Sequence, residues 1–351
     1  MKPLELIWDE PVLIHNIPPI DFQLYTDNPE PGMFGSEYPR LTRLSDGNWI
    51  IVYTLSDNPG YAAYSSGGKR LEFALSEDCG RNWSVLSRLS DEGRDLDNGQ
   101  MIELPNGVLL VACRTVIWHQ SYKIVVYESL DKGKSWNYRS TVDENHGVPG
   151  ALGHPDKGVY EPHFQLLPDG RLSVMYANEI HVTEDIPYSQ IISQKISSDG
   201  GLSWGNEIWV AWDPHDPEAR PGMSVWDRMK DGRYIVVFEV CATHGGNVYY
   251  KISSDGFTWE PGIGKAIVGQ YAGPYILSLS DGGLLVTSNS GNLSYSNDFG
   301  ENWSLMEKAA FPYHLWSSVY QTGEREIAVL NSMHRKEGGH NIQIRFADIV
   351  K

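Results

Sequence analysis

Apolar residues recur along this chain in short runs that end at a tight polar turn. An Asp-Gly or Asn-Gly pair stands between two such runs, and these pairs are the strongest short sequence signal for a β-hairpin. A leucine or methionine precedes most of the turns by two positions. The pattern predicts an all-β fold with six hairpins. They centre on Asp46-Gly47, Asn106-Gly107, Asp169-Gly170, Asp231-Gly232, Asp281-Gly282 and, more loosely, Thr322-Gly323.

A second repeat follows five of the hairpins and has the spacing Ser-x-Asp-x-Gly-x-x-Trp, with one copy a residue shorter. Asp oxygens can accept backbone N–H groups in a tight turn, Gly adopts positive φ without strain, and Trp can anchor the turn on a sheet. We interpret these boxes as structural staples of one repeated unit, not as sites of chemistry. The copies begin at Ser76, Ser129, Ser197, Ser253 and Ser296 and end at Trp83, Trp136, Trp204, Trp259 and Trp303.

The two repeats together predict the architecture. Six hairpins, five of them followed by a third strand and a box, predict a six-bladed β-propeller with four-stranded antiparallel blades, in a single domain over residues 1–351. The sixth blade lacks the box. We expect its later strands to be Ile342–Ala347 and an N-terminal strand such as Leu6–Ile14, which would close the ring and leave no exposed strand edge.

The composition limits the classes of partner and substrate that this chain is expected to bind. The chain has 351 residues and a formal net charge of −17, which argues against nucleic acid and favours a neutral substrate such as an oligosaccharide. The three cysteines form no CxxC pair and indicate no disulfide framework. The eleven histidines show no metal-ligand spacing, and no dinucleotide or phosphate-binding motif is present. We therefore expect no metal and no cofactor.

The N-terminal residues and the apolar runs indicate where the protein is located. The N-terminal residues lack the apolar stretch of a secretion signal, and no apolar run is long enough to span a membrane. We expect a monomer without membrane contact that is cytoplasmic as written, or secreted if the sequence is a mature form.

The hairpin spacing also predicts where chemistry lies, because the strand ends opposite the turns share one face of the disc. Positions about eight residues before or after each turn should lie at one mouth of the central funnel. Several of these positions carry charged or amide side chains. An apolar β core does not normally place Arg and Glu at such positions unless they pair or act. The residues expected there are Arg40, Asn98, Arg114, Glu161, Asn178, Glu239 and Asn289.

Two of these residues form a candidate catalytic pair. Glu161 opens one innermost strand, and Glu239 ends a very apolar strand of the next blade. Glycoside hydrolysis needs two carboxyl groups that face the same substrate. One must be protonated so that it can give its proton to the leaving oxygen, and the other must be ionised. The alternative is that each Glu is paired with Arg40, Arg114 or Arg220 for structure alone.

The Ser-x-Asp-x-Gly-x-x-Trp box resembles the Asp-box of the sialidase superfamily, which implies a six-bladed propeller. Within that superfamily the chain is most similar to glycoside hydrolase family 93, the exo-α-1,5-L-arabinanases. The segments that carry this resemblance are Tyr38-Pro39-Arg40, Asn98-Gly99, Tyr160-Glu161-Pro162, Arg220-Pro221-Gly222-Met223 and Phe238-Glu239.

The resemblance implies a retaining reaction that releases arabinobiose from the non-reducing end of linear arabinan. It implies Glu161 as general acid/base and Glu239 as nucleophile. Tyr320 and Tyr271 are candidates for an accessory tyrosine, and Asp227 adds an acid near the mouth without an assigned role. The residues expected to bind substrate are Arg40, Asn98, Arg114, Asn178, Arg220, Asn289 and Tyr320.

Two alternatives stay open. A sialidase would use Arg40, Arg114 and Arg220 as a triad for a substrate carboxylate, but Trp316 stands where its nucleophilic tyrosine is expected. A non-catalytic glycan-binding propeller would keep the boxes without the chemistry, and substitutions of Glu161 or Glu239 would then leave function unchanged.

Overall fold

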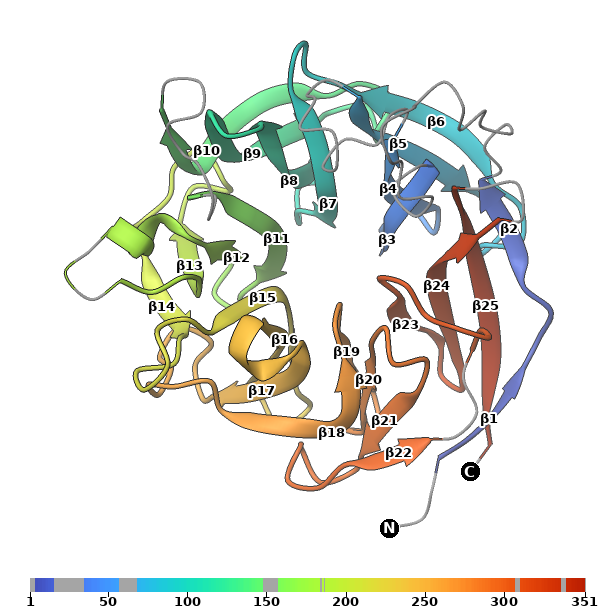
Figure 1. Ribbon diagram of the computed structural model, residues 1–351. Helices are drawn as coiled ribbons and strands as arrows, with labels where there is room; N and C mark the ends of the chain where they lie inside the picture. The colour runs from blue at the N-terminus through green and yellow to red at the C-terminus, as the bar shows by residue number, and fades with distance from the viewer. Residues whose placement is uncertain are drawn as a thin grey trace.

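The computed structural model describes residues 4–15, 35–56, 68–147, 157–183, 185, 187–306, 310–335 and 339–350. These residues form an all-β structure whose sheets stand around a central axis in a propeller-like arrangement (Figure 1). Within them, the helical segments are two short 3₁₀ turns, Ile180–Thr183 and Ala242–His244. None of the helices in this part of the chain has the length and apolar character needed to cross a membrane.

Four sheets contain four antiparallel strands each, and every one runs from the centre outward in chain order. The first has β7 (Asp95–Glu103), β8 (Leu109–Ile117), β9 (Ser121–Ser129) and β10 (Asn137–His146). The second has β11 (Val159–Leu166), β12 (Leu172–Asn178), β13 (Ile191–Ser197) and β14 (Ile208–Ala211). The third has β15 (Arg220–Arg228), β16 (Tyr234–Cys241), β17 (Asn247–Ser253) and β18 (Lys265–Tyr271). The fourth has β19 (Tyr275–Ser278), β20 (Leu284–Thr287), β21 (Leu293–Ser296) and β22 (Ser304–Met306).

The remaining strands form one nine-stranded sheet that joins the two ends of the chain. Its first part has β3 (Gly35–Arg43), β4 (Trp49–Ser56), β5 (Lys69–Ser76) and β6 (Ser84–Leu89). Its second part has β23 (Ser318–Gly323), β24 (Glu326–His334) and β25 (His340–Val350). One parallel pair, His340 with Gly35, connects the two parts.

The N-terminal segment lies along the last strand, as expected, but as two strands instead of one. β1 (Glu5–Trp8) and β2 (Val12–His15) both pair antiparallel with β25. Leu6 lies opposite Ile349, and Val12 lies opposite Ile344. The N- and C-terminal ends of the chain therefore lie side by side in Figure 1.

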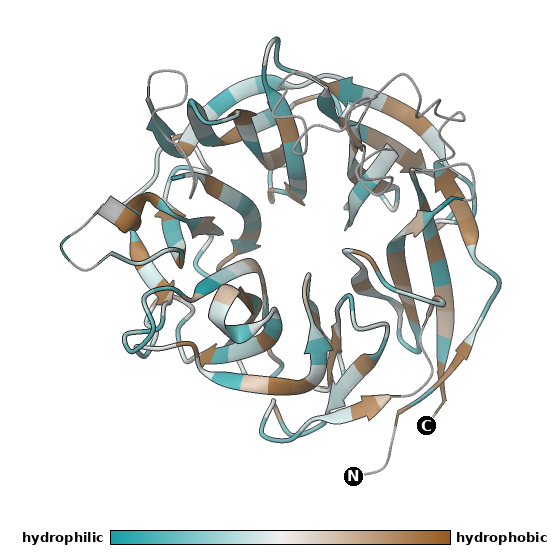
Figure 2. Cartoon of the chain, in the orientation of Figure 1, coloured by the Kyte–Doolittle hydropathy of each residue, from teal (hydrophilic) through white to brown (hydrophobic). Residues whose placement is uncertain are grey.

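The core lies between neighbouring sheets. In Figure 2 apolar residues lie on the strands of every sheet, whereas the connecting loops are mostly polar. One buried cluster, for example, packs Tyr176 of β12 with Trp226 of β15 and Phe238 of β16. Each sheet thus buries both faces against its neighbours, which explains why strands such as β4 are apolar along most of their length.

Hydrogen bonds also join neighbouring innermost strands around the central channel. Each bond uses the side chain of one strand and the backbone of the next, so backbone groups left unpaired at the inner edge are satisfied. The bonds are Thr42 Oγ1 to Met101 O (3.0 Å), Phe164 N to Gln100 Oε1 (2.8 Å), Ser278 N to Asp227 Oδ2 (2.8 Å) and Leu41 N to Tyr320 Oη (3.0 Å).

The Ser-Asp-Gly-Trp boxes hold the outer turns. In the first box Ser76 Oγ donates to Asp78 Oδ1 (2.8 Å) and accepts the N–H of Gly80 (2.8 Å). The later boxes repeat these two bonds. Three box tryptophans reach the preceding sheet through the indole N–H, from Trp136 to Ser87, from Trp204 to Ser140 and from Trp259 to Gln194.

The Gly80→Ala substitution tests how tightly the first box is packed. Gly80 has a φ of +83°, and a Cβ there would lie 2.8 Å from the Trp49 ring and 3.0 Å from the Phe346 ring. We expect a loss of at least about 2 kcal/mol in the free energy of unfolding, from backbone strain and overpacking together. Gly107→Ala is the matched control, since Gly107 has a φ of +82° and no atom within 4 Å of its Cβ position. Equal losses in denaturant titrations of the two variants would show that packing plays no part.

Candidate active site

The innermost strands share an irregular feature at one end of the central channel. Register shifts interrupt the pairing of β3 with β4, β7 with β8, β11 with β12 and β15 with β16. Inside each shift one non-glycine residue has positive φ, a strained conformation that concentrates at functional sites. These residues are Tyr38 (54°), Asn98 (53°), Glu161 (61°) and Met223 (51°), and Gly273 and Trp316 have similar angles beside β19 and β23.

The two candidate carboxylates meet at this end. Glu161 lies in the bulge of β11, and Glu239 lies near the end of β16, opposite Gly222 of β15. A Cβ at Gly222 would lie 3.3 Å from Glu161 Oε2 and 3.9 Å from Glu239 Oε1, so these oxygens are no further apart than the sum of the two distances. Carboxyl groups of retaining glycosidases stand about 5–5.5 Å apart and those of inverting enzymes about 6.5–9.5 Å. This upper limit on the distance between the Glu161 and Glu239 oxygens is compatible with a retaining enzyme. It excludes only the widest separations found in inverting enzymes.

The two carboxyl groups differ in their hydrogen bonds. Among the described residues, Glu161 accepts one bond, from the backbone N–H of Met223 to Oε2 (2.6 Å). Glu239 accepts two, from the backbone N–H of Gly273 to Oε2 (2.5 Å) and from the thiol of Cys241 to Oε1 (3.4 Å). Donors stabilise an ionised carboxylate, so the surroundings of Glu239 favour its charge more than those of Glu161.

Burial raises the pKa of both carboxyl groups. Burial, and then the nearby charge of Glu239, raise the pKa of Glu161 from 4.5 to about 7. Burial also raises the pKa of Glu239, while the bonds from Gly273 and Cys241 and the charge of Arg220 oppose the rise. Glu161 therefore keeps its proton up to a pH near 7, while the hydrogen-bond donors on Glu239 favour its ionised form.

Arg114 and Arg220 flank the pair, and both act on Glu161 by lowering its pKa. Arg114 is tied to Asp97 (2.6 Å), and its guanidinium lies over the rings of Trp118 and Tyr160. Arg220 is paired with Glu179 and also donates to Gln190 Oε1 (2.9 Å). The Nε atoms of both arginines are buried without a partner. Each arginine thus contributes positive charge to the site while one terminal nitrogen of its guanidinium is bonded to a carboxylate.

Three further predicted residues lie around the same end of the channel. Asn98 and Arg40 line a small cavity together with Glu161, and Asn98 Oδ1 is buried without a partner. Arg40 donates to the carbonyl groups of Pro39 (2.9 Å) and Trp316 (3.2 Å). Asn289 Oδ1 accepts the N–H of Trp316 (2.8 Å) and lies beside Gly273. Asn289 thus supports the loop whose backbone holds Glu239.

Two predicted substrate-binding residues do not join this group. The amide of Asn178 is bonded to Ser193 and Glu207, toward the outer strands of its sheet. Tyr320 lies four residues beyond Trp316 toward the hairpin turn, and at about 3.3 Å per residue this places it deep along the channel. Asp227 is likewise near the turn end of β15 and not near the mouth.

The structure adds residues that the hairpin count missed. Tyr38, not Arg40, is the β3 counterpart of Asn98 and Glu161, as counting eight residues back from Asp46 shows. Its ring packs on Trp316 with centroids 4.2 Å apart, which places an aromatic pair at the mouth. Cys241 carried no catalytic motif, and its contact with Glu239 is visible only in three dimensions. Within the described residues, no group of three or more His, Cys, Asp or Glu side chains is arranged to hold a metal ion.

These observations define an all-β, propeller-like fold with a carboxylate pair at one mouth of its central channel. No family profile matches the sequence, and no curated protein is significantly similar to it in sequence. Several solved structures share the fold, among them proteins of glycoside hydrolase family 93, the family that the motifs resemble. Similarity extends to an α-L-arabinanase of Penicillium chrysogenum complexed with arabinobiose, with a TM-score of 0.76, 21% identity, and coverage of 97% of this chain and 98% of that one.

Two other solved structures are similar to this chain to different degrees. The family 93 α-L-arabinofuranosidase of Fusarium graminearum, in complex with arabinobiose, has a TM-score of 0.76 and 19% identity, with 98% of each chain covered. A sialidase of Streptococcus pneumoniae has a TM-score of 0.60 and 13% identity, with 92% of this chain and 69% of that one covered. The fold is therefore closer to the family 93 structures than to this sialidase.

Proposed function

We propose that this protein is a retaining, exo-acting glycoside hydrolase of plant-wall glycan that releases arabinobiose from the non-reducing end of α-1,5-L-arabinan. The main support is the pair of half-buried carboxyl groups beside Gly222, of which Glu161 has its pKa raised to about 7. Two structures with the same fold hold arabinobiose, which favours this substrate over other glycans. We also propose that the nine-stranded sheet represents two blades, which gives six in all.

The proposed reaction has two steps. Glu239 attacks the anomeric carbon while Glu161 donates its proton to the leaving glycosidic oxygen, so the C–O bond breaks and a glycosyl ester forms. Water then attacks the same carbon as Glu161 takes back a proton, and Glu239 leaves as a carboxylate. Two inversions give net retention. The single hydrogen bond to Glu161 leaves its Oε1 free to carry the proton, and the two donors on Glu239 favour the ionised nucleophile.

A sialidase mechanism is less well supported. It needs three arginines that converge on a substrate carboxylate. Arg40 is bonded to two carbonyl groups, Arg114 to Asp97 and Arg220 to Glu179. These partners already use the positive charge that such a triad would supply.

The direct test is hydrolysis of linear and branched arabinan, with products sized by mass and the anomeric form followed by NMR. We expect arabinobiose from the linear polymer, first seen in the same anomeric configuration as the substrate linkage. Hydrolysis of a sialyl-fluorophore without action on linear arabinan would contradict the proposal. An inverted first product would reject the retaining step alone.

The pH dependence of kcat/KM should be bell-shaped. Glu161 must be protonated, so activity should fall as pH rises through about 7, where its carboxyl group ionises. Glu239 must be ionised, so activity should also fall at low pH, with a midpoint above the ordinary Glu value of 4.5 because its pKa is raised. Initial rates on linear arabinan in buffers of constant ionic strength would show both limbs. A rate that stays constant from pH 6 to 8 would argue against Glu161 as the acid.

A further inference from the structure

The central channel widens into a second pocket at its other end. This pocket has a volume of about 810 Å³ and is lined by the turn-proximal halves of the innermost strands. Gln165 and Asp227 lie in it, whereas Glu161 and Gly222 lie at the opposite ends of the same strands β11 and β15. Small-molecule sites have volumes of about 300–1,000 Å³ and combine aromatic walls with a few placed polar groups. The pocket has the size of a ligand site and contains neither member of the carboxylate pair.

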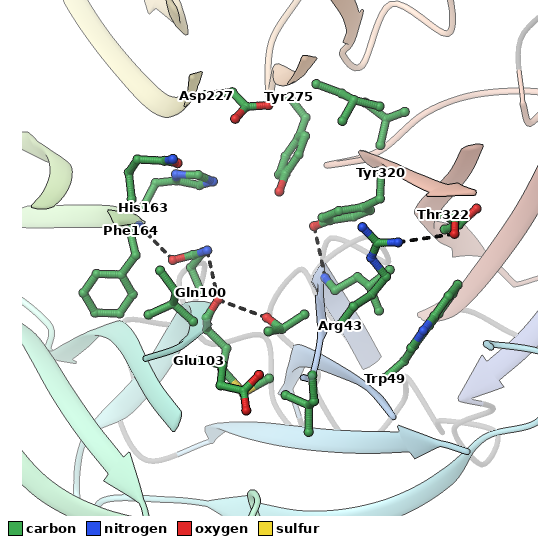
Figure 3. A pocket seen from close by; sticks show the side chains of 18 of the residues that line it. Arg43, Trp49, Gln100, Glu103, His163, Phe164, Asp227, Tyr275, Tyr320 and Thr322 are labelled. Atoms are coloured by element: carbon green, nitrogen blue, oxygen red, sulfur yellow. Dashed lines mark hydrogen bonds between the residues drawn. The ribbon is translucent and has the colours of Figure 1, made fainter. Parts of the chain in front are cut away.

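His163 supplies the main polar feature of this pocket. Its side chain points into the pocket from β11 (Figure 3), and the residue is only 6% exposed. Both ring nitrogens are buried, and neither has a hydrogen-bond partner among the residues that the structure describes. Burial and the charge of Arg40 lower the pKa of His163 to about 3, so the ring is neutral and offers one donor and one acceptor. Unpaired buried groups are costly, but neither nitrogen is open to the pocket as the ring stands, so an occupant bonds the imidazole only when the ring turns.

The neighbouring groups also combine donor and acceptor character. Figure 3 shows Tyr275 and Tyr320 facing the pocket opposite His163, with Gln100 on the same side as His163. The hydroxyl of Tyr320 accepts the N–H of Leu41 (3.0 Å) and keeps its own proton to donate. The rings of His163 and Tyr275 lie 6.0 Å apart, and those of Tyr275 and Tyr320 lie 5.3 Å apart. The wall thus offers aromatic faces and polar tips together.

Charge in the pocket is nearly balanced. Arg43 and Glu103 lie at the rim with opposite charges, and Arg43 donates to the carbonyl of Thr322 (3.3 Å). Asp227 accepts the N–H of Ser278 (2.8 Å), and burial raises its pKa to about 6. An anion would find no free cation at the neutral His163, and an apolar ligand would leave the imidazole unpaired. A neutral ligand whose groups both donate and accept fits best.

We propose that this pocket is a second binding site for a neutral polyhydroxylated small molecule, of the size of a mono- or disaccharide, held by His163, Tyr320 and Gln100. Sugar hydroxyls donate and accept in the same way as these side chains, and the apolar faces of a sugar ring pack on Tyr275 and Tyr320. The site stands apart from the proposed hydrolysis, since it uses neither Glu161 nor Glu239. Its occupant enters from the turn face of the disc.

Calorimetric titration with L-arabinose and with arabinobiose, together with a crystal soak, tests the proposal. We expect density for the sugar beside His163, and affinity at least tenfold weaker after Ile102→Trp, which fills the pocket. Leu277→Trp is a second filling variant in case the first fails to fold, and His163→Phe removes both nitrogens at similar size. Leu202→Trp is the control, because it adds the same ring at a site that is 58% exposed.

The variants distinguish sugar binding in this pocket from sugar binding at the mouth that holds Glu161 and Glu239. Binding that survives in Glu239→Gln but is lost in the filling variants and in His163→Phe supports the proposal. Binding that is unchanged in the filling variants and lost only with changes at the mouth overturns it. Absence of measurable binding to the wild-type protein, or density for water alone beside His163 in the soaked crystal, overturns it as well.

Discussion

Glu239→Gln should lower kcat on linear arabinan by about 10⁴-fold or more, since a nucleophile that forms the covalent intermediate has no substitute in the site. Glu161→Gln should lower kcat by about 10²–10⁴-fold, the range of general acid–base catalysis. Both losses should appear in kcat rather than KM, because both groups act on the reacting atoms. Glu301→Gln is the matched control, since the Glu301 side chain is 60% exposed at the surface. Steady-state kinetics on purified variants measure all three.

Folding should be retained in these variants. Burial raises the pKa of Glu161, so at a pH above about 7 the folded protein carries an ionised group that the fold disfavours. Glutamine removes that charge and can still accept the N–H of Met223. We therefore expect the free energy of unfolding of Glu161→Gln at pH 8 to equal or exceed that of the wild type. A large loss of stability would instead point to a structural role for the carboxylate.

Chemical rescue separates the two roles. An aryl α-L-arabinoside with a good leaving group needs no protonation, so it should restore the first step in Glu161→Ala but not in Glu239→Ala. Azide should then give a glycosyl azide of retained configuration with Glu161→Ala and of inverted configuration with Glu239→Ala, since it replaces water in one case and the nucleophile in the other. Interchanged results would exchange the two roles. Full activity in both Gln variants on every glycan would favour the non-catalytic propeller.

The sequence predicted the strands well because its signals were local. Asp-Gly and Asn-Gly turns specify hairpin register directly, so counting from Asn106, Asp169 and Asp231 identified Asn98, Glu161 and Met223, which occupy equivalent bulges. The family resemblance that these motifs suggested is confirmed for the fold by the solved structures.

The differences lie at residues whose position in the channel was not taken from the count of eight. A bulge adds one residue to a strand and shifts which side chains face the channel. Arg40 lies six residues before Asp46, whereas Tyr38 lies at the count of eight that also gives Asn98 and Glu161. Tyr320, proposed from the family resemblance, and Asp227 both lie near the turn end of the channel. The pairing of His340 with Gly35 joins residues from opposite ends of the chain, and no local pattern indicates it.

Asp97→Ala should destabilise the fold more than any surface substitution, by about 3–5 kcal/mol, because it removes the partner of two buried cations. Asp97 is 1% exposed and accepts bonds from Lys69 Nζ (3.2 Å), Arg114 (2.6 Å) and the hydroxyl of Thr54 (2.7 Å). Among the described residues, Lys69 would then keep one anion, Glu37, at 3.5 Å. Denaturant titration measures the loss. Asp46→Asn is the control, since the Asp46–Lys132 pair lies at the surface and should matter little.

The pH dependence gives the same network a second test. Lys69 and Arg114, together with the bond from Thr54, hold the pKa of Asp97 well below its usual 3.8. A carboxyl group with a lowered pKa stabilises the fold above its unfolded pKa, and this contribution disappears as pH falls from about 4 toward the folded value. Asp97→Asn should therefore lower stability at pH 7 and lose less of it on acidification than the wild type. Because Arg114 also lowers the pKa of Glu161, a freed Arg114 that turns toward the mouth should move the alkaline limb of kcat/KM to lower pH. If Asp97→Asn loses stability but the alkaline limb of the kcat/KM profile stays at the same pH, Asp97 has a structural role alone.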